Sequence, residues 1–183
     1  LLLEYGIKWN YPWSGEVTDL QTGLVKTAYK TANPKARIAC ALSHYGLWQK
    51  ASEMDEPLLV LEHDAVFTTK FDFDPAKVKG NIIGINNPLG CTRRASYYYE
   101  SIITKQDKFQ LAPYIDDLKI PQGLAGNSAY IINKKGASHM LDLVREYGLW
   151  PNDALMCRQL VPTLGVTKEY YTKVLGFGST TSL

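Results

Sequence analysis

The segment 57–67 constrains the fold more than any other stretch, because an aliphatic run in it ends abruptly in charged residues. The aliphatic residues 58–61 follow a proline and are too few for a helix, so they predict a strand covered on both faces of a sheet. Glu62, His63 and Asp64 come next, and such charges are costly inside a core unless they have partners. At the carboxyl end of a strand in an open α/β sheet, they would lie at the crevice where ligands bind.

Two interpretations of this charged turn remain open. Carboxylate oxygens are hard ligands that bind Mg²⁺ or Mn²⁺ and leave positions free for a substrate diphosphate, so Glu62 and Asp64 are candidate metal ligands. A turn at the end of a strand whose charges merely face water would explain the same residues without any ligand.

Helices and strands alternate along the rest of the chain. Apolar residues at steps of three and four predict helices, and short aliphatic runs bounded by glycine, proline or asparagine predict strands. This order predicts one α/β domain over residues 1–183 with a mostly parallel central sheet. The expected elements are helices at 37–54, 134–147 and 154–160, strands at 58–61 and 81–86, and a glycine-bearing turn that leads into a strand within 123–132.

The stretch 90–122 is the least regular part of the sequence. A loop of this length inside a compact domain is usually a lid or a binding element. It contains the pair Arg93–Arg94 and the tyrosines 97–99, which would suit a ligand surface, although an edge strand explains the tyrosines equally well. The basic residues between 26 and 37 predict either a solvated loop or a loop that contacts phosphate.

Charge and cysteine content narrow the functional classes. A net charge of +2 is too mild to indicate nucleic-acid binding by itself. The cysteines Cys40, Cys91 and Cys157 form no CxxC pair, so we expect reduced thiols in a cytoplasmic protein. No apolar run approaches the roughly 20 residues of a membrane span, and contact with a membrane surface is left open. The sequence begins without Met, so a targeting segment before Leu1 is also left open.

Several short motifs follow one another in a recognisable order. They are Cys40–Ala41–Leu42–Ser43–His44 with Trp48 downstream, Leu59–Val60–Leu61–Glu62–His63–Asp64–Ala65, Gly126–Asn127–Ser128–Ala129–Tyr130–Ile131–Ile132 before Lys134–Lys135–Gly136–Ala137, and Pro151–Asn152–Asp153. Each motif is weak alone, but the order and spacing together resemble glycosyltransferase family 25. That family comprises the lipooligosaccharide galactosyltransferases and the collagen galactosyltransferases. The resemblance extends from about Arg37 to Asp153.

The resemblance implies a GT-A type, Rossmann-like fold, a UDP-sugar donor, a divalent cation (Mn²⁺ or Mg²⁺) and inversion at the anomeric carbon. It also implies transfer of galactose or a similar hexose to a glycan such as a lipopolysaccharide core. The family's acidic triplet usually reads Glu-Asp-Asp, whereas His63 takes the middle position here and Glu62 and Asp64 keep the flanking carboxylates. The family's opening strand and Arg-rich turn have no counterpart in the sequence, and we expect them to precede Leu1.

The resemblance also assigns roles to individual residues. Asp153 is the expected general base that takes the proton from the acceptor hydroxyl, and Glu62 and Asp64 are the expected metal ligands. The remaining expected contacts are Ser43, His44 and Asn86 with the donor, and Asn127 and Tyr130 with the acceptor.

Two other functions remain open. One is a transferase that glycosylates modified DNA bases, as some viruses carry, because aromatic side chains stack on bases and cations contact phosphates. The other is a catalytically inactive protein that binds nucleotide sugars on the same scaffold, to which the altered acidic triplet would be suited.

Overall fold

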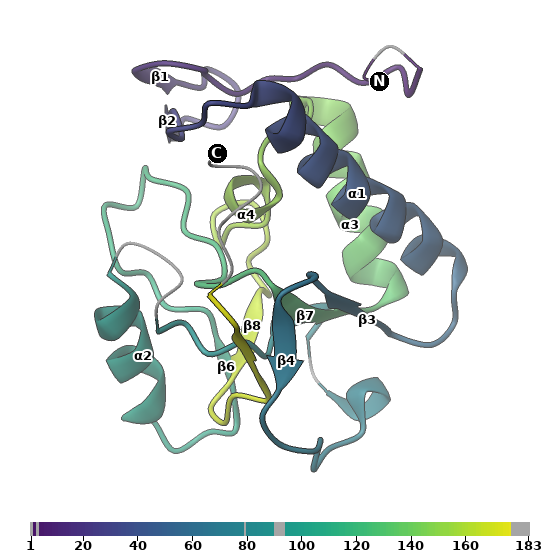
Figure 1. Cartoon of the computed structure of the whole chain (residues 1–183), viewed down its shortest axis with the longest axis vertical. Helices are drawn as coiled ribbons and strands as arrows, with labels where there is room; N and C mark the ends of the chain where they lie inside the picture. The colour runs from purple at the N-terminus through teal and green to yellow at the C-terminus, as the bar shows by residue number, and fades with distance from the viewer. Residues whose placement is uncertain (1, 3, 79, 90–93, 177–183) are drawn as a thin grey trace.

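The computed structural model describes residues 2, 4–78, 80–89 and 94–176. Over these residues the chain forms an α/β structure with a five-stranded sheet and two small two-stranded sheets (Figure 1). The helices are α1 (Pro34–Glu53), α2 (Ala95–Ile103), α3 (Lys134–Tyr147), the single-turn α4 (Asn152–Leu155) and the 3₁₀ helix η1 (Pro75–Lys77). No helix in the described ranges is long and apolar enough to cross a membrane.

The five-stranded sheet has the order β3-β7-β5-β8-β6. Its strands are β3 (Leu58–Leu61), β5 (Ile82–Gly84), β6 (Phe109–Leu111), β7 (Ala129–Ile132) and β8 (Gly165–Thr167). The small sheets pair β1 (Glu16–Thr18) with β2 (Val25–Thr27) and β4 (Ala65–Phe67) with β9 (Thr172–Val174).

The prediction of a mostly parallel sheet is wrong. Strand β7 pairs antiparallel with both β3 and β5, and β6 pairs antiparallel with β8. Within this sheet, β5 and β8 are the parallel pair. An aliphatic run reports that a strand is buried on both faces, but it does not report the direction in which the strand runs. That direction depends on where the preceding connection re-enters the sheet, which the strand's own residues do not specify.

The long helices α1 and α3 agree well with the prediction from periodicity. Helix α1 begins at Pro34, where an asparagine followed by a proline favours a helix start, and the Asn33 side chain accepts a hydrogen bond from the Ala36 N–H and caps the helix. Helix α3 ends at Gly148, whose φ of 80° suits a glycine. The two helices pack side by side along one side of the sheet (Figure 1).

Two other predicted elements are corrected by the structure. The helix expected over 154–160 ends after one turn, because the Arg158 N–H donates to the Gln122 carbonyl and Cys157 forms a β-bridge with Gly123. The tyrosines 97–99 lie on helix α2 instead of an edge strand, and Tyr98 is buried. Cys91 and Arg93 lie outside the described residues.

The β1–β2 hairpin forms a sheet of its own and is attached to the domain by a buried lysine. Lys26 Nζ lies 2.6 Å from Asp19 Oδ2 and donates to the Asn10 carbonyl at 2.8 Å. The same ammonium lies 4.5 Å from the centre of the Trp150 ring, which belongs to the main core. The hairpin is thus fixed through the buried Lys26 and Asp19, whereas Leu20 in its turn is exposed.

Candidate functional site

The Glu62 carboxylate is held by both of its oxygens where β3 ends. His44 Nε2 lies 3.3 Å from Oε1, and the Ser128 hydroxyl donates to Oε2 at 3.1 Å. The Glu62 N–H also donates to the Ser128 carbonyl at 2.8 Å, which ties the turn to the segment before β7. The hydrogen bond with His44 is the main cause that lowers the pKa of the Glu62 carboxyl. Glu62 is therefore an oriented carboxylate that stays ionised.

A buried hydroxyl supports the His44 side of this contact. Tyr130 is fully buried in β7, and its hydroxyl lies 2.8 Å from His44 Nδ1 and accepts a hydrogen bond from Trp48 Nε1 at 3.0 Å. Because an indole N–H can only donate, the Tyr130 proton is left to donate to Nδ1. The network then favours the His44 tautomer that carries its proton on Nε2, facing Glu62. Helix α1 supplies both His44 and Trp48, four residues apart on one helical face.

Removing the Tyr130 hydroxyl is expected to destabilise the fold and loosen Glu62. In Tyr130→Phe, the Trp48 N–H and His44 Nδ1 lose their partner in the core, which should lower the free energy of unfolding by about 1–3 kcal/mol. Urea denaturation measures the loss. The control is Tyr97→Phe, which removes a hydroxyl from a half-exposed tyrosine on α2. Equal stabilities of the two variants would contradict the proposed support.

Asp153 lies in the first turn of α4 as a half-buried residue whose carboxyl oxygen Oδ1 is buried. Among the described residues, its Oδ1 has no hydrogen-bond partner. Burial is the main cause that raises the pKa of the Asp153 carboxyl, and the nearby Glu62 charge raises it further. The Arg37 charge and a hydrogen bond with Tyr29 act in the opposite direction. The structure thus brings Asp153 within electrostatic range of the acidic turn.

Helix α4 is connected to α1 beside this carboxyl. The Cys40 thiol contacts Asn152 Oδ1 at 3.8 Å. Burial raises the pKa of the Cys40 thiol to about 11, with further contributions from the charges of Glu62 and Asp153. The thiol is therefore protonated at neutral pH and adds no third negative charge near the two carboxylates.

Two arrangements of side chains could hold a metal ion. Within the described ranges, Cys40, His44 and Glu62 bring one potential ligand atom each to within 4.8 Å of one another. His44 and Ser128 already occupy the two Glu62 oxygens with hydrogen bonds. Asp64, which follows in the same turn, has a buried Oδ1 without a hydrogen-bond partner in the described structure, and this oxygen is free to bind a cation.

Asn127 is the other unsatisfied polar side chain beside the turn. It is 7% exposed and adjoins Ser128, which binds Glu62. Neither its Oδ1 nor its Nδ2 has a partner among the described residues. The turn before β7 also contains Gly126 with a φ of 73°, as the glycine pattern predicts. A buried amide with both atoms unpaired is unusual in a folded protein and points to a ligand.

The remaining predicted contacts lie in different settings. Ser43 is exposed on α1, and its hydroxyl donates to the Ala39 carbonyl at 2.9 Å. Asn86 is buried after β5 and accepts a hydrogen bond from the Thr172 hydroxyl at 2.9 Å. The structure does not bring either side chain into the hydrogen-bonded group around Glu62.

Two residues that interact electrostatically with Asp153 were not among the predicted site residues. Arg37 was expected only as a basic residue at the start of the helix over 37–54, and it lies in the first turns of α1 with its guanidinium 4.8 Å from the centre of the Tyr29 ring. Tyr29 in turn interacts with Asp153 and lowers the pKa of its carboxyl. No local pattern marks either residue, whereas the spacing of Cys40 and His44, four apart in a predicted helix, could have indicated their proximity.

Comparison with known proteins places this geometry in context. A family model described as glycosyltransferase family 25 (LPS biosynthesis protein) matches residues 19–156. Searches of the curated proteins and of the solved structures found no significant match. The matched range includes Tyr29, helix α1, the acidic turn, β7 and α4, and therefore every residue of the site around Glu62 and Asp153.

Proposed function

The chain belongs to glycosyltransferase family 25 and is a glycosyltransferase, and on this premise we propose that it transfers a hexose such as galactose from a UDP-sugar to a hydroxyl of a glycan, for example a lipopolysaccharide core. The observation that carries the proposal is the pairing of two interacting carboxyls with opposite pKa shifts. The pKa of the Asp153 carboxyl is raised, and the pKa of the Glu62 carboxyl is lowered. Environments that separate the pKa values of two neighbouring carboxyls commonly divide an acid–base role from a charge-bearing role.

Asp153 is the proposed general base. The acceptor oxygen forms its bond to the anomeric carbon as the bond to the UDP oxygen breaks on the opposite face. The acceptor proton moves to Asp153 Oδ1, the oxygen without a hydrogen-bond partner in the described structure. A raised pKa favours this transfer because it brings the basicity of the carboxylate closer to the operating pH.

The residues of the acidic turn fit the divalent cation that the family implies. The unpaired Asp64 Oδ1 is the available ligand atom, and Glu62 adds an oriented negative charge two residues earlier in the same turn. When bound, Mg²⁺ or Mn²⁺ supplies Lewis-acid stabilisation of the diphosphate. His63 is exposed, so the imidazole in the middle position faces solvent and leaves the two flanking carboxylates to the site.

Other contacts follow from the structure by inference. The free amide of Asn127 is suited to a sugar hydroxyl of donor or acceptor. Tyr130 is buried and bonded to His44, so we expect it to position Glu62 rather than to contact the acceptor. The roles of Ser43 and Asn86 in donor binding, the GT-A type of fold and the cytoplasmic location remain predictions.

A screen of nucleotide release tests the proposal. The protein is incubated with UDP-hexoses and core oligosaccharide, and released UDP is measured with Mn²⁺, with Mg²⁺ or with a chelator. We expect UDP release that requires a divalent cation and falls sharply in Asp64→Asn, because that variant loses a charged ligand. Calorimetric titration with Mn²⁺ and UDP should show the same loss, whereas Asp55→Asn, at an almost fully exposed site, should behave as the parent does.

The same screen separates the alternatives. Binding of UDP-sugars without any release of UDP would indicate the inactive binding protein and refute the proposed transfer. Transfer to DNA gains no support from the structure, because Lys26, part of the basic stretch that motivated it, is buried against Asp19. Of the tyrosine triplet, Tyr98 is buried as well.

A further inference from the structure

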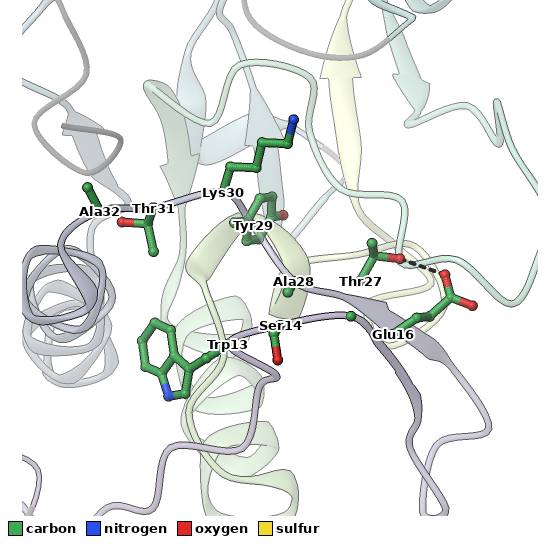
Figure 2. Close-up of a pocket in the computed structure, with 10 residues that line it drawn as sticks. Trp13, Ser14, Glu16, Thr27, Ala28, Tyr29, Lys30, Thr31 and Ala32 are labelled. Atoms are coloured by element: carbon green, nitrogen blue, oxygen red, sulfur yellow. Dashed lines mark hydrogen bonds between the residues drawn. The ribbon is translucent and has the colours of Figure 1, made fainter.

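A groove of about 900 Å³ lies along two segments at the base of the β1–β2 hairpin, residues 13–16 and 27–32 (Figure 2). Its walls combine aromatic rings with polar groups. The lining includes Trp13, Ser14, Glu16, Thr27, Tyr29 and Lys30. The Glu16 carboxylate accepts a hydrogen bond from the Thr27 hydroxyl at 3.0 Å, so the polar groups are held in place across the two strands.

One wall of the groove is a fixed aromatic surface. Trp13 is 43% exposed, and its ring stacks on Trp9 with centroids 4.9 Å apart and planes 9° apart. Trp9 is anchored in turn by a hydrogen bond from its Nε1 to the Tyr11 carbonyl at 3.0 Å. The stack therefore holds the Trp13 ring in place while part of it faces solvent. Figure 2 shows the ring projecting from its segment beside the groove.

Tyr29 connects the groove with the proposed base. Its ring stacks on Tyr11 with centroids 5.7 Å apart and carries the Arg37 guanidinium on a face. Its hydroxyl lies close enough to the Asp153 carboxyl for each group to shift the pKa of the other. Asp153 thus interacts with the wall of the groove through Tyr29 and with the acidic turn through the charge of Glu62.

We propose that this groove binds the acceptor glycan, with the face of a pyranose ring against Trp13 and the reactive hydroxyl directed past Tyr29 to Asp153. The inference rests on the proposed function. In a single displacement the base must lie on the acceptor side of the anomeric carbon and the leaving diphosphate on the other. The Asp153 carboxyl interacts both with Tyr29 in the wall of the groove and with Glu62 in the acidic turn. It is therefore suited to act between an acceptor in the groove and a diphosphate at the turn.

The chemistry of the walls agrees with a sugar ligand. Aromatic rings provide large apolar contact area for the C–H face of a pyranose, and a few placed polar groups fix its orientation. Here Ser14, Thr27 and the Glu16 carboxylate supply hydroxyl and carboxylate partners. The uracil ring of the donor is the competing occupant for an aromatic wall. The contact of Tyr29 with Asp153 instead of the acidic turn favours the acceptor.

Kinetics of Trp13→Ala test the proposal with core oligosaccharide released from rough-type lipopolysaccharide as the acceptor. We expect the acceptor KM to rise by about 3- to 10-fold, the loss that corresponds to one aromatic contact. The kcat at saturating acceptor and the donor KM should stay unchanged. Trp13→Phe, which keeps a ring, should restore the KM to within about twofold of the parent, again on the scale of a single aromatic contact. Leu20→Ala, at a 97% exposed position of the same hairpin, is the matched control.

Calorimetric titration of the oligosaccharide without donor gives an independent reading. The parent should bind it, and Trp13→Ala should bind it correspondingly more weakly. An unchanged acceptor affinity in Trp13→Ala, a rise in the donor KM alone, or no oligosaccharide binding by the parent overturns the proposal. Failure of the proposed function itself gives a different result, namely oligosaccharide binding that depends on Trp13 with no UDP release from any donor.

Discussion

Asp153→Asn is expected to lower kcat by about 10²- to 10⁴-fold, the usual contribution of a general base, while donor binding is retained. The substitution keeps the shape of the side chain but removes the group that takes the acceptor proton. Its neighbours Arg37 and Tyr29 remain in place, so the loss reports on the chemistry and not on the packing of α4. The measurement is UDP release at saturating donor and acceptor, with calorimetric titration of the UDP-sugar to verify binding.

The same variant is expected to be more stable than the parent at neutral pH. Burial raises the Asp153 pKa above its usual value of 3.8, so ionisation of the folded protein is less favourable than ionisation of the unfolded chain. The contribution of such a group to stability is fully present below the unfolded pKa and is lost as the pH rises through the folded pKa. Asparagine does not ionise and avoids this loss, so its advantage should appear at neutral pH and vanish below about pH 3.8.

A matched control tests both the expected loss of kcat and the expected gain of stability. Asp142→Asn changes an exposed carboxylate on α3 that pairs with Arg145, and it should leave both kcat and the pH dependence of stability unaltered. Near-parental turnover of Asp153→Asn would reject the assignment of the base. Lower stability of Asp153→Asn at neutral pH would show that the carboxylate is favourably paired in the folded protein.

Gly123→Ala is expected to displace Asp153, because Gly123 packs directly against the backbone of α4. A Cβ at Gly123 would lie 2.3 Å from the Asp153 carbonyl oxygen and 2.9 Å from that of Met156. Both contacts are with backbone, so α4 or the segment 121–124 must shift. Overpacking of this kind typically costs about 1–3 kcal/mol of stability, and occasionally more. A displacement of about 1 Å at a catalytic group can lower the rate by about 10²-fold.

Gly136→Ala separates the loss of stability from the loss of geometry. Its Cβ would lie 2.4 Å from the Asn81 carbonyl oxygen, a similar clash between α3 and the start of β5. Both variants should unfold at lower urea concentrations than the parent. Below their transitions, Gly136→Ala should keep most of the parental kcat, whereas Gly123→Ala should not. Equal residual activities would show that the close approach at Gly123 has no special bearing on Asp153.

Local patterns predicted the elements of the site better than their arrangement. The run 58–61 identified β3, and the charges after it identified the turn that carries Glu62 and Asp64, because burial and desolvation are readable from neighbouring residues. The antiparallel direction of β7 could not be predicted from its own residues, because the long connection before a strand determines its direction. The early end of α4 follows from pairing with a segment more than 30 residues away.

The roles of buried polar residues were also beyond local reasoning. Tyr130 is one tyrosine in an apolar strand, and the sequence alone does not show that Trp48 and His44 meet at its hydroxyl. Tyr29 and Trp13 lie in a segment without periodicity, where nothing local indicates a groove. Such assignments require the tertiary contacts, because each depends on residues from different elements.

The separate attachment of the β1–β2 hairpin has an evolutionary consequence. Its strands share no hydrogen-bonded ladder with the main sheet, and Lys26 links it to the Asn10 carbonyl and the Trp150 ring. Changes around the exposed Leu20 can therefore accumulate without disturbing the strands that carry the acidic turn, whereas Asp19 and Leu24 in the same turn are buried and constrained. Related proteins can vary their surface at this turn, and the turn is a suitable position for inserting a new peptide segment.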